Sequence, residues 1–99
     1  MRRGTTPKHT FTLPFDTATI EKIRVIYAQR DAVVFEKKES DVHLVGNEVR
    51  VTLTQADTLK LQSAYKTEIQ IRVLTKSGQA FASDIVSVNT DRCMTDEVL

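Results

Sequence analysis

The chain has 99 residues, of which 40% are hydrophobic and 27% charged, with a formal net charge of +1. A chain of this length forms one domain with a modest core, and the near-neutral charge excludes a strong field for nucleic acid or anionic membrane. Cys93 is the single cysteine, so no intramolecular disulfide can form, which fits a reducing compartment. No apolar run resembles a signal peptide or a membrane span, and we expect the protein to be made in the cytoplasm.

The first element in chain order is the run HTFTLPF, residues 9–15, in which apolar and polar residues alternate. This period of two predicts a strand with one buried face. Pro14 lacks a backbone donor, so the strand lies at a sheet edge or ends there.

The second and third runs are residues 20–28 and 32–38, joined by a predicted three-residue loop at 29–31. That loop length places Ala28 opposite Ala32, Val25 opposite Phe35 and Arg24 opposite Glu36. The pairing would put apolar residues on the core side and opposite charges on the solvent side.

The next pair, DVHLVGNEVRVTLT, spans residues 41–54 and turns at Gly46-Asn47. Both turn residues tolerate positive φ, which favours a two-residue hairpin loop. The loop places Val45 opposite Glu48, Leu44 opposite Val49, Val42 opposite Val51 and His43 opposite Arg50. Turn chemistry and hydrophobic alternation therefore predict the same register.

The stretch LTQADTLKL, residues 53–61, interrupts this alternation. Thr54 can cap the following turn and Asp57 favours a helix start, so we expect one short helical turn near residues 55–61. This connection is too long for a tight hairpin and suits a crossing between two sheets, with Leu59 and Leu61 closing the end of the core.

The last pair of runs is KTEIQIRVLTKSGQAFASDIVSV, residues 66–88. A loop at 76–78 with Gly78 left-handed places Val73 opposite Phe81 and Ile69 opposite Ile85. The apolar phase then changes, which predicts a bulge or bend near 85–86.

These elements predict an all-β, immunoglobulin-like antiparallel sandwich of about seven strands in a single domain, residues 1–99. A small, partly open barrel is the alternative fold. Residues 1–7 and 90–99 are predicted terminal arms, which either fray or become ordered against a neighbouring molecule.

The sequence presents no catalytic, cofactor-binding or metal-binding constellation, so we expect no enzyme and no cofactor. His9 and His43 lack partners at metal-ligand spacing: His9 is expected to be partly buried on a strand and His43 to face solvent. Cys93 lies beyond the last strand without a neighbouring base. Five apolar residues lie on outward strand positions or in the C-terminal arm and form a candidate assembly surface: Ile26, Val34, Leu74, Val98 and Leu99.

Four segments carry a family resemblance: TTPKHTFTLPFD, GNEVRVTLTQADTLKL, TEIQIRVLTKSGQAFASDIVSV and RCMTDEVL. Together they resemble a family of small uncharacterised proteins encoded by phages and prophages of Gram-positive gut bacteria. The order of strands is also loosely similar to the N-terminal immunoglobulin-like domain of phage baseplate upper proteins. Those proteins continue into long further domains, whereas this sequence ends at Leu99, so we expect no bridge to a receptor-binding module from this chain alone.

The resemblance implies a non-enzymatic structural or adaptor protein of a phage or prophage particle, in the tail or baseplate. Its partners would be other virion proteins or further copies of itself, with no nucleic acid and no membrane, and it would be incorporated into a virion. The alternative function is a small ligand- or carbohydrate-binding sandwich module, although the chain has no tryptophan and two tyrosines. A small enzyme is the weakest hypothesis.

Overall fold

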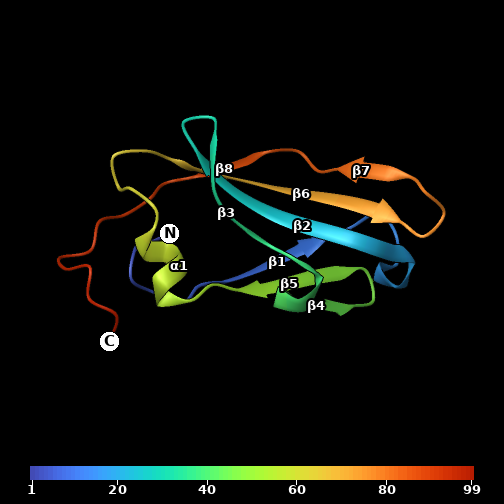
Figure 1. Ribbon diagram of the computed structural model, residues 1–99, viewed down its shortest axis with the longest axis horizontal. Helices are drawn as coiled ribbons and strands as arrows, with labels where there is room; N and C mark the ends of the chain where they lie inside the picture. The colour runs from blue at the N-terminus through green and yellow to red at the C-terminus, as the bar shows by residue number, and fades with distance from the viewer.

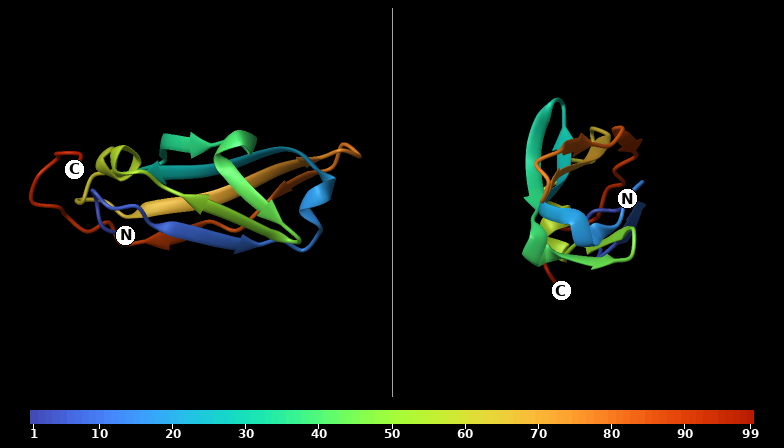
Figure 2. Two further views of the ribbon diagram at one scale, coloured as in Figure 1. Left: turned by 90° about the horizontal axis from the view of Figure 1, so that it is seen from below. Right: turned by 90° about the vertical axis from the view of Figure 1, so that its right-hand side faces the viewer.

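The strands form two antiparallel sheets that face each other, as the computed structural model describes for all residues 1–99 (Figures 1 and 2). The three-stranded sheet has the order β1-β5-β4, and the five-stranded sheet has the order β3-β2-β6-β7, with β8 also pairing with β6. The predicted all-β, immunoglobulin-like sandwich is thereby confirmed. The bounds of the strands are β1 Lys8–Thr12, β2 Ile20–Gln29, β3 Ala32–Lys37, β4 Val42–Val45, β5 Glu48–Thr52, β6 Thr67–Thr75, β7 Ala80–Ala82 and β8 Val86–Val88.

Alternate residues of the central strands fill the space between the sheets. β2 contributes Ile23, Val25 and Tyr27, each with no exposed surface, and the inward positions of β5 and β6 are also buried. Because the side-chain period of a strand is two, the intervening residues of β2 and β6 point outward to solvent. The buried apolar core consists of Leu13, Ile20, Ile23, Val25, Tyr27, Phe35, Val49, Val51, Leu53, Leu61, Ile69, Ile71 and Val73.

The β4–β5 hairpin has the predicted register at every position. Leu44 lies opposite Val49, Val42 opposite Val51, and His43 opposite Arg50. Gly46 has a φ of +58°, as the two-residue turn requires. Turn and pattern act together here to direct every apolar residue toward the core.

The predicted β2–β3 register is wrong. The turn is Arg30-Asp31, with φ values of +53° and +62°, so Gln29 is a strand residue that pairs with Ala32. A bulge after Tyr27 then places Phe35 opposite Tyr27 instead of Val25. In the observed register, Val33 is exposed on the hairpin.

The β6–β7 pairing is confirmed at Val73 and Phe81, and Gly78 has the expected positive φ of +89°. Ile69, however, pairs with Val86 and not with Ile85. The predicted irregularity is present as a break between β7 and β8, where the Ile71 amide donates to the Ser83 hydroxyl at 2.9 Å. The serine side chain thus replaces a strand backbone acceptor.

The connection between the sheets contains the expected short helix, α1 Gln55–Leu59. Thr54 and Asp57 form a capping box: the Asp57 amide donates to Thr54 Oγ1 at 3.1 Å, and the Thr54 amide donates to Asp57 Oδ2 at 2.9 Å. Leu61 is buried at the end of the core and Leu59 is half-buried. Two 3₁₀ turns, Thr17–Thr19 and Glu39–Asp41, precede β2 and β4.

Both terminal arms lie against the domain at the α1 end (Figure 1). Arg2 forms a parallel bridge with Asp91, and the Met1 ammonium donates to the Asn89 carbonyl at 2.7 Å. Further along the C-terminal arm, Asp96 pairs with Arg3 at 2.9 Å. The arms are therefore ordered by one another and by α1.

Candidate functional site

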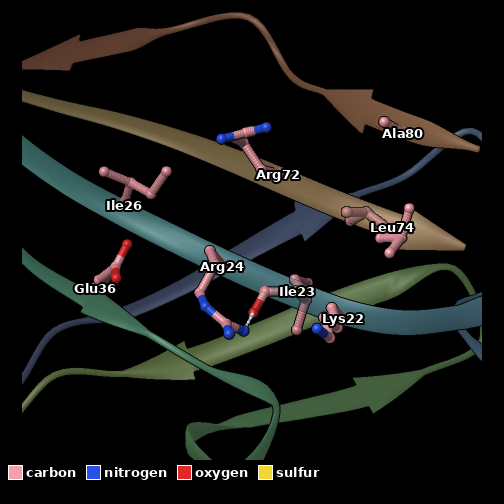
Figure 3. Close-up of a pocket in the computed structure, with 9 residues that line it drawn as sticks. Lys22, Ile23, Arg24, Ile26, Glu36, Arg72, Leu74 and Ala80 are labelled. Carbon is pink, nitrogen blue, oxygen red and sulfur yellow. Dashed lines mark hydrogen bonds between the residues drawn. The ribbon is translucent and has the colours of Figure 1, made fainter.

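A shallow pocket of about 310 Å³ lies on the outer face of the five-stranded sheet. The strands β2 and β6 build its floor, and β3 and β7 flank it (Figure 3). Charged and aliphatic side chains alternate along it instead of separating into two zones. The lining residues are Lys22, Ile23, Arg24, Ile26, Glu36, Arg72, Val73, Leu74 and Ala80.

The β2–β6 register places two arginines directly opposite one another at the centre of this pocket. Arg24 pairs with Arg72 across the strands, and Lys22 pairs with Leu74 one step away along the same face. Like charges in cross-strand positions are destabilising. Positive charge is therefore concentrated on this face, although a pair of opposite charges across the two strands would make the sheet more stable.

One of the two arginines is neutralised within the chain. Arg24 Nη1 donates to Glu39 Oε1 at 2.8 Å, and Glu39 Oε1 also accepts from the Ile23 amide at 2.8 Å. Hydrogen bonds from the Glu39 and Ile23 backbone amides, together with Arg24, lower the pKa of Glu39 to about 2. Glu39 thus remains a carboxylate at any physiological pH.

Arg72 has no such partner. Its side chain is exposed, and its guanidinium donates no hydrogen bond to the protein and lies within 4.0 Å of no carboxylate oxygen. Two aliphatic side chains, Ile26 and Leu74, lie on either side of the arginine pair (Figure 3). The pocket can therefore accept a group that carries both a carboxylate and a small apolar surface.

The structure distributes the five residues of the candidate assembly surface over three places. Ile26 and Leu74 share the outer pocket, whereas Val34 lines a separate hollow beside Tyr65 and the β2–β3 turn. Val98 and Leu99 lie at the exposed end of the C-terminal arm, 58% and 93% exposed.

The basic residues of the pocket were not part of the assembly surface predicted from the sequence. Lys22, Arg24 and Arg72 come from β2 and β6, which are far apart in the sequence and not joined by a hairpin. Hairpin loops determine the register between consecutive strands alone, so no local signal predicts that Arg24 faces Arg72.

The two histidines and the cysteine, which were considered from the sequence for metal binding or catalysis, lie apart from the outer pocket. His9 is half-buried and its Nδ1 lies 2.8 Å from the Tyr27 hydroxyl, while His43 is exposed, as expected for both. Cys93 is half-buried, and its Sγ lies 3.1 Å from the position that a Cβ on Gly4 would take. No three histidine, cysteine or carboxylate side chains come together in a metal-binding group.

The comparisons with known proteins give little beyond the fold. No protein-family model matches the sequence, and no curated protein matches it. Among solved structures, the V domain of amphioxus IgVJ-C2 is similar over 91% of this chain and 96% of that chain, with 11% sequence identity and a TM-score of 0.39. A similarity at this level carries no argument about function. The structure also has no helix of the length and apolar character needed to cross a membrane.

Proposed function

We propose that this chain is a non-enzymatic structural or adaptor protein that acts through protein–protein assembly, in the tail or baseplate of a phage or prophage particle. The observation that carries the assembly role is the Arg24–Arg72 pair bordered by Ile26 and Leu74 on an exposed sheet face. The phage setting rests on the four sequence segments that resemble phage and prophage proteins.

Arg72 places a positive charge without an ion-pair partner on the exposed face of the sheet. Glu39 already neutralises Arg24, whereas the Arg72 guanidinium has no anionic partner, and a partner's carboxylate would provide one. Apolar side chains beside such a pair gain free energy when a partner covers them, because they leave water on binding. Both features therefore favour the docking of another protein surface.

A ligand- or carbohydrate-binding module remains the alternative function. Small-molecule sites usually combine a concave pocket with aromatic walls, and the outer pocket is shallow and lined by aliphatic and charged residues. A glycan array with competable binding would favour this alternative over assembly.

The assembly role is tested by sedimentation velocity of the purified chain over a range of concentrations, alone and with the tail and baseplate proteins of the same phage. Complexes with itself or with one of those proteins are expected, and R72E should weaken them. K66E is the matched control, since Lys66 is exposed in the loop before β6 and the substitution makes the same change in charge. A chain that remains monomeric and binds none of these proteins would contradict the proposal.

A further inference from the structure

The exposed end of the C-terminal arm carries acidic residues that can pair with the basic residues of the outer pocket. Residues 96–99, here called the DEVL segment, carry two carboxylates followed by two aliphatic side chains. The Asp96 side chain is 78% exposed, and the aliphatic side chains of Val98 and Leu99 face solvent. Exposed aliphatic side chains at the end of an acidic segment gain from burial in a basic, apolar-edged site.

We propose that the DEVL segment of one copy docks in the outer pocket of a second copy. This inference rests on the proposed assembly function and names its partner. The Glu97 carboxylate of the segment would pair with Arg72, the arginine without a partner in its own chain, and the aliphatic residues of the segment would cover Ile26 or Leu74. Charge complementarity selects this occupant.

The position of the segment explains why the contact joins two copies. The C-terminus lies at the α1 end of the sandwich, where β6 begins, whereas Leu74 is the penultimate residue of β6, near its far end (Figures 1 and 2). Within its own chain the segment is held beside Arg3 and Gln55. The segment and the pocket therefore lie at different places on the molecule, so the contact joins two copies, either reciprocally in a two-fold dimer or head-to-tail in a ring or a filament.

The contacts that now hold the segment are of a kind that a second copy can replace. In the Asp96–Arg3 ion pair the Asp96 side chain is 78% exposed, so water can replace the contact on that side. Arg3 also donates to the Leu61 and Leu59 carbonyls, at 2.5 Å and 2.9 Å. Release of Asp96 would therefore leave the Arg3 guanidinium with two acceptors, and α1 would keep its contact with the N-terminal arm.

Opposite substitutions on the two surfaces test this contact in the full-length chain. R72E reverses the charge in the pocket, and E97R reverses a charge in the DEVL segment. Each is expected to lower the self-association constant by about tenfold in sedimentation velocity. The variant that carries both R72E and E97R should return to within about threefold of the wild type, because the two charges are exchanged and not lost. Circular dichroism checks that each variant keeps its fold.

A peptide probe isolates the segment from the rest of the arm. A fluorescein-labelled MTDEVL peptide with an amidated end should bind the wild-type chain in fluorescence anisotropy, and the R72E chain about tenfold more weakly. The same peptide with Asn and Gln in place of Asp96 and Glu97 serves as the control and should bind no better to wild type than to R72E.

The outcomes separate this inference from the assembly function. If E97R associates as the wild type does while R72E does not, the DEVL segment is not the occupant, and another partner's acidic surface fills the pocket. If neither substitution changes an observed association, the outer pocket is not the interface at all. If the chain is monomeric and binds no phage protein, the inference and the assembly function fall together.

Discussion

His9 Nδ1 lies 2.8 Å from the Tyr27 hydroxyl in the space between the two sheets, with the two rings stacked at a centroid distance of 5.8 Å. The contact joins β1 of one sheet to β2 of the other. Tyr27 stacks in turn on Phe35 at 4.7 Å. A half-buried, titratable imidazole thus packs against the aromatic residues of a core that is otherwise aliphatic.

The stability of the fold should decrease as the pH falls below the ordinary histidine pKa of 6.5. Burial, followed by the nearby N-terminal ammonium, lowers the pKa of His9 in the folded state. Between the lowered folded pKa and 6.5, the unfolded chain therefore binds a proton that the folded chain does not, and the free energy of unfolding decreases with decreasing pH. Urea unfolding at pH 7.5, 6.5 and 5.5 measures this slope.

His9→Gln should remove this pH dependence, because the amide can still bond to the Tyr27 hydroxyl and does not titrate. His43→Gln is the matched control, since His43 is exposed opposite Arg50 and should leave the slope as it is. An unchanged slope in the His9 variant would show that another group takes up the proton.

The Lys37–Asp57 ion pair connects β3 to the capping box of α1. Lys37 Nζ lies 2.6 Å from Asp57 Oδ2, and the two side chains are 16% and 10% exposed. Although burial alone would raise the pKa of Asp57, hydrogen bonds from Lys37 and Thr54 lower it overall. The carboxylate thus satisfies both a helix end and a partly buried ammonium.

Asp57→Ala should lower the free energy of unfolding by about 2–3 kcal/mol, because it removes the cap and leaves the Lys37 ammonium partly buried without a partner. Urea unfolding checks this value. Glu48→Ala gives the comparison: its pair with Arg50 is exposed, and its loss should cost less than about 1 kcal/mol. Equal effects of the two substitutions would contradict the capping argument.

A strand pairing could be predicted from the sequence where a short loop with a clear turn signal joins the two strands. The β4–β5 register was predictable because Gly46-Asn47 specifies the turn and the flanking valines independently specify the faces. The β2–β3 register was not, because Arg30-Asp31 takes positive φ without a glycine or asparagine, so the sequence favours a longer loop. Arg24 meets Arg72 through a pairing between β2 and β6 that no turn encodes.

Gln29 is the residue whose role changes most when that register is corrected. It is 5% exposed, and its Nε2 donates to the Gln62 carbonyl at 2.9 Å and to the Tyr65 carbonyl at 3.2 Å. Its Oε1 accepts from the Gln62 amide at 2.8 Å. Gln29, which the sequence placed in a turn, therefore connects the loop between α1 and β6 to the core through its hydrogen bonds.

Gln29→Leu should lower the free energy of unfolding by about 2–3 kcal/mol, since it leaves the Gln62 amide and carbonyl without their partner in a partly buried position. Gln29→Glu tests the donor side alone, because the carboxylate keeps an acceptor for the Gln62 amide and loses the donor. Thermal unfolding of the two variants, with hydrogen exchange at the Gln62 amide, measures both effects. Fast exchange of that amide is expected in the leucine variant. Protection equal to the wild type would show that the Gln29 side chain does not protect it.

Asp31→Gly should stabilise the protein by about 0.5–1 kcal/mol, because a residue with a Cβ pays for left-handed backbone and glycine does not. Asp31 has a φ of +62° in the β2–β3 turn and makes no side-chain hydrogen bond or ion pair, so the substitution removes strain and no contact. Arg30 is kept, since its guanidinium donates to the Tyr65 hydroxyl at 3.1 Å. Asp31→Ala is the matched control: it removes the same carboxylate, retains the Cβ and should give no gain in the urea midpoint. If the alanine variant gained as much as the glycine variant, the stabilisation would come from the lost charge and not from relief of backbone strain.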